Sequence, residues 1–240
     1  MKTWFISDLH LDASRPQIIQ LFLDFLDTIK PQADALYILG DLFEYWIGDD
    51  ALDLPSSKPF IPVISKLQEL SDFGIKLYFI AGNRDFLIDK QFADKTGCEI
   101  LADEKIIDLY GTKTLIMHGD TLCTDDVEYL KLRALIRSEK WQTDFLSLSI
   151  EERIKEAQKL RDASKEQTAS KPEEIMDVNQ QSVEDTMNKW SVTQLIHGHT
   201  HRMATHQFVL NKQPVNRIVL GDWYNDLHYL SIDKQSQILR

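Results

Sequence analysis

The first half of the chain alternates short apolar runs with longer stretches that carry apolar residues on one face only. The runs Trp4–Ser7 and Leu36–Leu39 predict buried strands, and residues 16–30 between them predict a helix. Further helices are expected over residues 60–73 and 86–95. Further strands are expected over residues 76–80, 105–110, 114–117, 194–196, 206–210, 217–220 and 229–232. This order favours a layered α/β fold with its sheets at the centre.

Residues 126–171 differ from the rest of the chain. They are predicted to form helices inserted between two β regions, and they hold ten basic and nine acidic residues. Their apolar residues include Leu130, Leu132, Leu135, Ile136, Trp141, Phe145, Leu146, Leu148 and Ile150. We interpret this segment as a helical cap or lid on a single domain that spans residues 1–240. The pattern alone is equally typical of a helical hairpin that completes the core.

Composition and charge narrow the class of protein. With 43% hydrophobic and 27% charged residues the chain has no tract typical of disorder, and a formal net charge of −11 disfavours a general nucleic-acid binder. Cys98 and Cys123 are too few for a disulfide scaffold and fit a reducing compartment. The apolar N-terminus is interrupted by Asp8 and His10 too early for a signal peptide, and no stretch reaches the roughly 18 apolar residues that span a bilayer.

Five short segments share two properties: each follows a predicted strand, and each presents side chains that bind hard metal ions. They are Asp8-Leu9-His10, Gly40-Asp41, Gly82-Asn83-Arg84-Asp85, His118-Gly119-Asp120 and Gly198-His199-Thr200-His201. Loops that follow the strand ends of an α/β sheet are where ligands gather, so distant segments can converge. Three of the segments have a glycine before the ligand, which permits a tight turn beside the site. One such segment alone would be weak evidence for a metal site, but the five together predict one.

The candidate metal ligands are carboxylates, an amide and imidazoles: Asp8, His10, Asp41, Asn83, His118, His199 and His201. Such ligands without a thiolate favour Mn²⁺, Mg²⁺, Fe²⁺ or Zn²⁺ in an open, catalytic site. Seven ligands are too many for one open ion, so we expect two ions that share Asp41 as a bridge. A pair about 4 Å apart lowers the pKa of a shared water and neutralises phosphoryl oxygens during in-line displacement. The set predicts hydrolysis of a phosphoester or phosphoanhydride.

These segments, in this order, resemble those of the calcineurin-like metallophosphoesterases over most of the chain. The resemblance implies a four-layer α/β/β/α sandwich. Four longer strings are similar to those of the UDP-2,3-diacylglucosamine pyrophosphatases of lipid A synthesis in Gram-negative bacteria: Ile38–Glu44, Trp46–Asp50, His118–Asp126 and Ile175–Asn179. This narrower resemblance implies cleavage of UDP-2,3-diacylglucosamine into lipid X and UMP, with two Mn²⁺ per chain. It also implies a peripheral protein at the cytoplasmic face of the inner membrane.

Arg84 departs from the general family pattern, in which many members have histidine after the ligand asparagine. Arginine stays protonated and cannot act as a general acid, but it can bind phosphate oxygens through two hydrogen bonds. A phosphate leaving group, with a pKa of about 6, requires no proton donor. Arg84 thus favours a diphosphate substrate, attacked by water at the α-phosphorus. The catalytic set that we expect is Asp41, Asn83, Arg84, His118 and His199.

Further substrate contacts are expected on the cap. Arg161, Ser164, Thr168 and Lys171 lie three, four and three residues apart, so one continuous helix presents them on one face. Without the resemblance, a solvated face would explain this pattern. The resemblance implies that Asp126, Ser164, Lys171, Asn83, Arg84 and His199 contact the substrate, with Thr168 standing where some relatives have asparagine. Tyr129 is added because it lies near Asp126.

The remaining candidates have no motif of their own. His197 could orient a metal ligand or belong to the core, His206 and His228 have no assignment, and Trp223 is expected to pack in the core. The expected partners are the lipid nucleotide and the membrane surface, without nucleic acid or an obligate protein partner. Two rival functions are a metallophosphoesterase of other specificity, such as a nucleotide phosphodiesterase, and a non-catalytic scaffold. The scaffold should have lost ligands, and none of the seven is missing.

Overall fold

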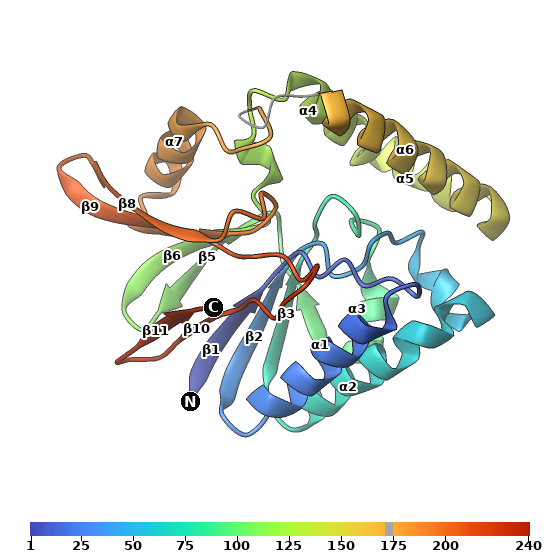
Figure 1. Cartoon of the computed structure of the whole chain (residues 1–240), viewed down its shortest axis with the longest axis horizontal. Coiled ribbons are helices and arrows are strands. Elements are labelled where there is room, and N and C mark those ends of the chain that lie inside the picture. Colours follow the sequence, from blue (N-terminus) through green and yellow to red (C-terminus); the bar gives the residue numbers. More distant parts are fainter. Residues whose placement is uncertain (171–174) are drawn as a thin grey trace.

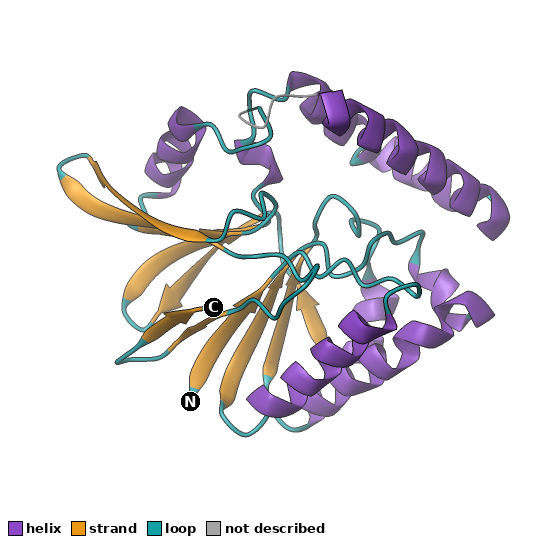
Figure 2. Ribbon diagram, in the orientation of Figure 1, coloured by secondary structure: helices purple, strands orange, loops and turns teal. Residues whose placement is uncertain are grey.

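The computed structural model describes residues 1–170 and 175–240, apart from the side chains of residues 56 and 163–170. Two β-sheets stack face to face, and helices cover their outer faces (Figures 1 and 2). The predicted α/β class and its layered sandwich are therefore confirmed. The cap helices lie apart from these layers, above the loops at one end of the sheets (Figure 1).

The first sheet positions three of the ligand segments. Its strand order is β11-β10-β1-β2-β3-β4, and β1 to β4 run parallel. The strands are β1 (Lys2–Ile6), β2 (Ala33–Leu39), β3 (Lys76–Ile80), β4 (Cys98–Ile100), β10 (Leu230–Ile232) and β11 (Gln237–Leu239). Because the carboxyl ends of parallel strands meet at one edge of a sheet, the loops after β1, β2 and β3 bring Asp8, Asp41 and Asn83 to the same place.

The second sheet supplies the other two segments. Its order is β5-β6-β7-β9-β8, with β7 parallel to both of its neighbours. The strands are β5 (Glu104–Leu109), β6 (Thr112–Met117), β7 (Gln194–His197), β8 (Ala204–Leu210) and β9 (Gln213–Val219). His118 directly follows β6, and the Gly198–His201 segment directly follows β7. Parallel pairing of β6 with β7 therefore places these segments side by side.

Alternating side chains on the strands separate the layers. Phe5, Leu39 and Ile80 face the second sheet, where they meet the buried residues Ile196 and Ile218. The other face of the first sheet packs against α1 (Pro16–Ile29), α2 (Ile61–Asp72) and α3 (Lys90–Thr96). As expected, Trp223 is part of this core, where it contacts Phe22 and Phe25 edge to face. The outer face of the second sheet is covered by α7 (Gln180–Trp190), through Val183 and Met187.

The cap consists of α4 (Val127–Ile136), α5 (Glu139–Leu146) and α6 (Ile150–Ser170). Helix α4 buries no residue completely, and the buried Phe145 of α5 joins a small cluster with Ile47, Ala51 and Leu87. Arg153 of α6 is 5% exposed, donates hydrogen bonds to the carbonyls of Leu146 and Ile47, and pairs with Asp50. These helices therefore attach to the body through their own small cluster and do not complete the main core.

Several predicted boundaries differ from the structure. Helix α3 begins at Lys90, after the N-cap Asp89, and not at residue 86, because Phe86 and Leu87 turn toward the cap. Strands β4 and β11 and helix α7 were not predicted. Short 3₁₀ helices cover Asp49–Asp53, Pro55–Phe60 and Asp120–Leu122. Among the described residues, no helix has the length and apolar character that a bilayer crossing requires.

Candidate metal and substrate site

The seven predicted metal ligands meet in two adjoining groups. In the first group, His201 Nε2 lies 3.4 Å from both Asp8 Oδ1 and His10 Nε2. In the second group, Asn83 Oδ1 lies 3.1 Å from His118 Nε2 and 3.0 Å from His199 Nδ1. The two ring nitrogens of this second group are 3.2 Å apart. The first group comes from the loops after β1 and β7, and the second from the loops after β3, β6 and β7, so each group joins loops of both sheets.

Asp41 lies between the two groups. Its Oδ2 atom is 3.7 Å from His10 Nε2 and 3.8 Å from His118 Nε2. Its Oδ1 atom accepts the backbone N–H of Arg84 at 2.9 Å. One carboxylate oxygen is thus held by the protein, while the other is directed at both groups. Asp41 is therefore the residue that would be shared if each group held a metal ion.

The donor atoms suit divalent cations. Asp8 Oδ2 accepts two hydrogen bonds, one from the backbone N–H of His199 at 2.9 Å and one from Ser7 Oγ. Asp8 Oδ1 is buried and accepts no hydrogen bond from any described residue. The Nδ1 atom of His118 donates to the Leu39 carbonyl at 2.8 Å, so its Nε2 lone pair faces the site. An ion at each group would satisfy these inward-facing atoms.

The electrostatics of the site also favour cations. Burial acts to raise the pKa of Asp8, but the imidazole of His201, 3.4 Å away, together with those of His118 and His10, outweighs it and holds this pKa well below its usual range. Burial and the neighbouring His118 lower the pKa of His199 to about 4, so its lone pair is available at neutral pH. The ionised Asp8 and the neutral ring of His199 both offer lone pairs to a hard cation, while nearby carboxylates, against the effect of burial, raise the pKa of His118 and His201.

The backbone at these ligands is in an uncommon conformation. Asp8, His10, Asp41, His199 and His201 all have φ between 48° and 69°, in the left-handed region that side chains with a Cβ rarely adopt. Two of these residues, Asp41 and His199, follow a glycine, which permits close approach of the neighbouring loop. A Cβ on Gly40 would lie 2.6 Å from both the Gly82 Cα and the His118 ring. These positions show why glycine stands before the ligands.

Asp85 ends one of the five predicted segments, and its sequence context does not indicate a role. It is fully buried, and its carboxylate accepts backbone N–H groups from Gly82 at 2.9 Å and Leu42 at 2.7 Å. Burial and the adjacent Asp41 raise its pKa to about 6, against the effect of these hydrogen bonds. Asp85 therefore ties the loop after β2 to the loop after β3, on which Asp41 and Asn83 lie.

Glu44 is a second residue that the sequence analysis left without a role. Its Oε2 atom lies 3.4 Å from His10 Nδ1, and its Oε1 atom pairs with Arg161 Nη2 of the cap at 3.2 Å. Burial opposes ionisation, but His10, Arg84 and Arg161 lower the pKa of Glu44. A carboxylate on the outer nitrogen of a histidine ligand fixes its ring orientation and raises its basicity. Glu44 thus connects a metal ligand to the cap.

Asp120 connects the site to the cap on the opposite side. Its carboxylate accepts from Tyr129 Oη and Arg133 Nε, both at 2.6 Å and both from α4. Burial acts against the charge, but His118, His199 and Arg133 keep the pKa of Asp120 well below its usual range. The only hint in the sequence was its place two residues after His118.

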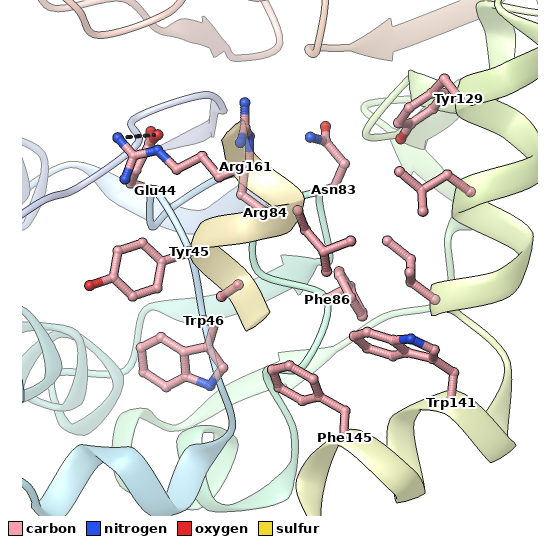
Figure 3. Close-up of a pocket in the computed structure, with 14 residues that line it drawn as sticks. Glu44, Tyr45, Trp46, Asn83, Arg84, Phe86, Tyr129, Trp141, Phe145 and Arg161 are labelled. Atoms are coloured by element: carbon pink, nitrogen blue, oxygen red, sulfur yellow. Dashed lines mark ion pairs between the residues drawn. The ribbon is translucent and has the colours of Figure 1, made fainter. Parts of the chain in front are cut away.

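An apolar pocket opens beside the ligand groups. Its walls include Phe86 of the body and five cap residues, Leu132, Ile136, Trp141, Phe145 and Leu160. Figure 3 shows the aromatic rings of Trp46, Phe86, Trp141 and Phe145 at one end of this pocket and Asn83, Arg84 and the Glu44–Arg161 pair at the other. Asn83, Arg84 and Tyr129 also line the cleft that contains the metal ligands. The apolar pocket and the metal cleft are thus neighbours.

The predicted substrate residues are partly brought together. Asn83, Arg84, Tyr129 and His199 line the metal cleft, and Arg161 lines the apolar pocket. Asp126 lines the cleft and caps α4 by accepting the Tyr129 backbone N–H at 3.1 Å. The side chains of Ser164 and Thr168, and all of Lys171, lie outside the described residues.

His197, for which two roles were open, is completely buried behind the ligand loop. Its Nε2 atom faces Arg217 Nη1 at 3.2 Å, and its Nδ1 atom lies 2.9 Å from the Gly198 carbonyl. Arginine has no acceptor, so Nε2 accepts from Arg217 and Nδ1 donates to Gly198. Burial and Arg217 lower the pKa of His197 to about 3, which keeps the ring neutral. His197 therefore links Arg217 to the loop that carries two metal ligands.

Comparison with known proteins places the chain in a family. Among solved structures, an archaeal phosphodiesterase has a TM-score of 0.47 with 14% identity, over 100% of both chains. The UDP-2,3-diacylglucosamine hydrolase of Nitrosococcus oceani is 50% identical over 223 residues, which are 93% of this chain and 88% of that protein. Proteins of the same name from Escherichia coli O7:K1 and Chromohalobacter salexigens are 50% and 49% identical; they align over 94% and 93% of this chain and 92% and 89% of their own lengths. A family model described as calcineurin-like phosphoesterase matches residues 1–203. The chain belongs to the calcineurin-like phosphoesterase family.

Proposed function

We propose that the protein hydrolyses the pyrophosphate bond of UDP-2,3-diacylglucosamine, giving 2,3-diacylglucosamine 1-phosphate (lipid X) and UMP for lipid A synthesis. The observation that carries this proposal is the apolar pocket that opens onto the metal cleft through Asn83, Arg84 and Tyr129. A substrate with acyl chains on one side of a diphosphate matches that arrangement. Relatives of this name, about 50% identical, align over more than nine tenths of the chain.

The proposed cofactors are two Mn²⁺ ions per chain. Asp8, His10, His201 and Asp41 would hold one ion, and Asp41, Asn83, His118 and His199 the other. When bound, such a pair neutralises phosphoryl oxygens and lowers the pKa of water. The donor atoms support hard divalent ions in general, so titration with Mn²⁺, Mg²⁺ and Zn²⁺ in parallel tests the choice of manganese.

Arg84 is proposed to bind the diphosphate. Its backbone N–H is fixed on Asp41 Oδ1, and its Nε atom donates to no described acceptor. The guanidinium lines both the cleft and the apolar pocket, where the diphosphate would lie. It can donate to phosphoryl oxygens while charge develops on the leaving phosphate, which needs no proton. Tyr129 cannot easily supply a proton, because its hydroxyl donates to Asp120 and its pKa is raised by burial and that carboxylate.

Water is proposed to attack the α-phosphorus, so that lipid X, through its 1-phosphate, is the leaving group. Hydrolysis in ¹⁸O-labelled water should then place one labelled oxygen in UMP. Label in lipid X would instead mean attack at the other phosphorus. The assay compares UDP-2,3-diacylglucosamine with bis(p-nitrophenyl) phosphate under Mn²⁺. Faster hydrolysis of the aryl diester would favour a nucleotide phosphodiesterase over the proposed activity.

Two neighbouring residues of α4 test the role of the apolar pocket. Ile136 lines the pocket, whereas Leu135 is 58% exposed. With a short-chain substrate in solution, Ile136→Asn should raise KM about tenfold, because a buried apolar side chain contributes about 1.5–3 kcal/mol. Leu135→Asn should leave KM unchanged, and neither variant should alter hydrolysis of the aryl diester. Equal KM values for both variants would contradict the assignment of this pocket.

We also propose that the protein works at the cytoplasmic face of the inner membrane as a peripheral protein. Exposed apolar residues on the cap support this: Val127, Leu135, Leu146, Leu148 and Ile154. A helical surface of this kind can bury apolar side chains at a lipid interface. Val127→Glu should reduce co-sedimentation with phospholipid vesicles, while Ile61→Glu, at an exposed site on α2, should not. Equal sedimentation of both variants would count against the cap as the membrane surface.

A further inference from the structure

A second, polar pocket lies on the other side of the ligand loop that follows β7. It is lined by residues from that loop, from β8 and β9, and from the segment before α7, with Asp177, Thr200, Arg202, His206 and Arg217 as its polar members. His206 and Arg217 are cross-strand partners of β8 and β9. None of these residues belongs to the seven metal ligands, and the pocket has no part in the chemistry described so far.

Arg217 is the unusual residue of this pocket. It is 7% exposed, yet among the described residues its guanidinium donates a hydrogen bond only to the neutral ring of His197, at 3.2 Å. Its buried Nε atom has no hydrogen-bond partner in the part of the chain that the structure describes. A buried guanidinium with an unused donor is costly unless an acceptor reaches it. The environment of Arg217 therefore points to an acceptor from outside the protein.

Thr200 gives a second, independent indication. Its Oγ1 atom is also buried, without a hydrogen-bond partner among the described residues. It lies between the metal ligands His199 and His201, and both it and Arg202 line the polar pocket and the metal cleft. The two pockets are thus joined at Thr200, and a molecule held by the metal ligands can extend past this residue.

The three hollows form a series. The apolar pocket meets the metal cleft through Asn83, Arg84 and Tyr129, and the polar pocket meets it through Thr200 and Arg202. The apolar and polar pockets have no lining residue in common. Acyl chains, a diphosphate and a nucleoside follow one another in the same order in the substrate of the proposed reaction.

We propose that the polar pocket binds the uridine end of the substrate, with the Arg217 guanidinium donating to a carbonyl oxygen of uracil. This rests on the proposed function, because it takes the nucleotide from that substrate. A further phosphate fits less well, because Asp177 lines the pocket and its carboxylate already pairs with Arg202 at 2.8 Å. Uracil offers neutral carbonyl acceptors, and ribose hydroxyls can donate to Asp177 or bond Thr200 Oγ1.

The test is equilibrium binding of UMP and ribose 5-phosphate to the Mn²⁺-loaded full chain, measured by calorimetry. The two probes share the phosphate and the sugar, and only UMP carries the base. Arg217→Met should weaken UMP binding about tenfold, as expected for a hydrogen bond from a charged donor, while ribose 5-phosphate binding stays within twofold. Arg217→Lys, which keeps the charge, should lie between. Lys212→Met, in the exposed β8–β9 turn, is the control and should change neither probe.

Each outcome decides the matter. Unchanged ribose 5-phosphate binding shows that Arg217→Met keeps the site folded, so a selective loss for UMP supports the proposal. Unchanged UMP binding, or an equal loss for both probes, overturns it. Thr200→Val provides a second variant of nearly the same volume, and it should weaken UMP more than lipid X. If the wild type does not hydrolyse UDP-2,3-diacylglucosamine but UMP binding depends on Arg217, the proposed function fails and the nucleotide pocket stands.

Discussion

Replacing Glu44 by glutamine tests whether the cap is coupled to metal binding. The substitution keeps the shape of a side chain that is 10% exposed and removes its charge. Glu44 lies 3.4 Å from the outer nitrogen of His10, which belongs to the first ligand group only. Loss of such a carboxylate lowers metal affinity about 10- to 100-fold, which corresponds to about 1.4–2.7 kcal/mol.

The structure further predicts that this loss is unequal. The second group, with Asn83, His118 and His199, has no contact with Glu44 among the interactions of the described residues, so its ion should bind as in the wild type. Calorimetric titration of Glu44→Gln with Mn²⁺ should therefore show one site with weakened Mn²⁺ affinity and one site with unchanged affinity. Glu99→Gln, an exposed glutamate on β4, is the control.

Arg161→Met separates the two contacts of Glu44. Arg161 is 25% exposed and pairs with Glu44 at 3.2 Å, so removal of this partly solvated ion pair should change Mn²⁺ affinity by less than about threefold. It should instead raise KM for the lipid substrate, because Arg161 lines the apolar pocket.

The assigned role of Glu44 would be refuted if Glu44→Gln weakened both Mn²⁺-binding sites equally, or if it weakened neither of them.

Four other outcomes follow from the contacts described above. Asp41→Ala should abolish turnover and binding of both ions in a Mn²⁺ titration, and near-normal turnover would remove Asp41 from the bridge. Arg84→Ala should lower kcat/KM about 10- to 100-fold, with Arg84→Lys intermediate, as a lost charged hydrogen bond predicts; equal rates for wild type and Arg84→Ala would contradict phosphate binding. In EDTA, His197 takes up a proton in the unfolded chain when the pH falls below 6.5. In the folded chain it stays neutral until the pH approaches its folded pKa of about 3. Stability should consequently fall by about 3 kcal/mol between pH 6.5 and 4 relative to His197→Gln in urea titrations, and parallel pH curves would refute this. Arg153→Met should increase hydrogen exchange in α5 and the start of α6 without changing β1 to β3, and unchanged exchange would show that the cap is held otherwise.

The parts of the fold that could be predicted are those with strong local patterns. The runs at Trp4–Ser7 and Leu36–Leu39 are buried, and polar ligands follow them directly, so both strand and site were visible in sequence. Strands β4 and β11 have three residues each, too few to show a period of two. Helix α7 is polar apart from a few positions such as Val183 and Met187, and the face that it buries became evident only against the second sheet.

The site was predictable to the extent that its chemistry lies in short segments. The seven side chains proposed as metal ligands, which the structure brings together, could be chosen from the sequence, because side chains that bind hard metal ions recur after strands. The roles of Glu44 and Asp85 could not, since each depends on a distance to a residue in another loop. The same holds for Arg217, whose burial beside His197 is a product of pairing between β7 and β9. Glu44, Asp85 and Arg217 are thus defined by contacts between loops or between strands, and not by their residue types.

The left-handed backbone at five of the proposed metal ligands limits how this centre can be altered or transferred. Each such residue is held in an unfavourable conformation, at a cost of about 1–3 kcal/mol, by the packing of two sheets. Copying the side chains alone onto another scaffold would therefore leave them pointing in the wrong directions. A designer who wishes to graft this centre must also reproduce the glycine turns and the buried Asp85 that keep the loops together.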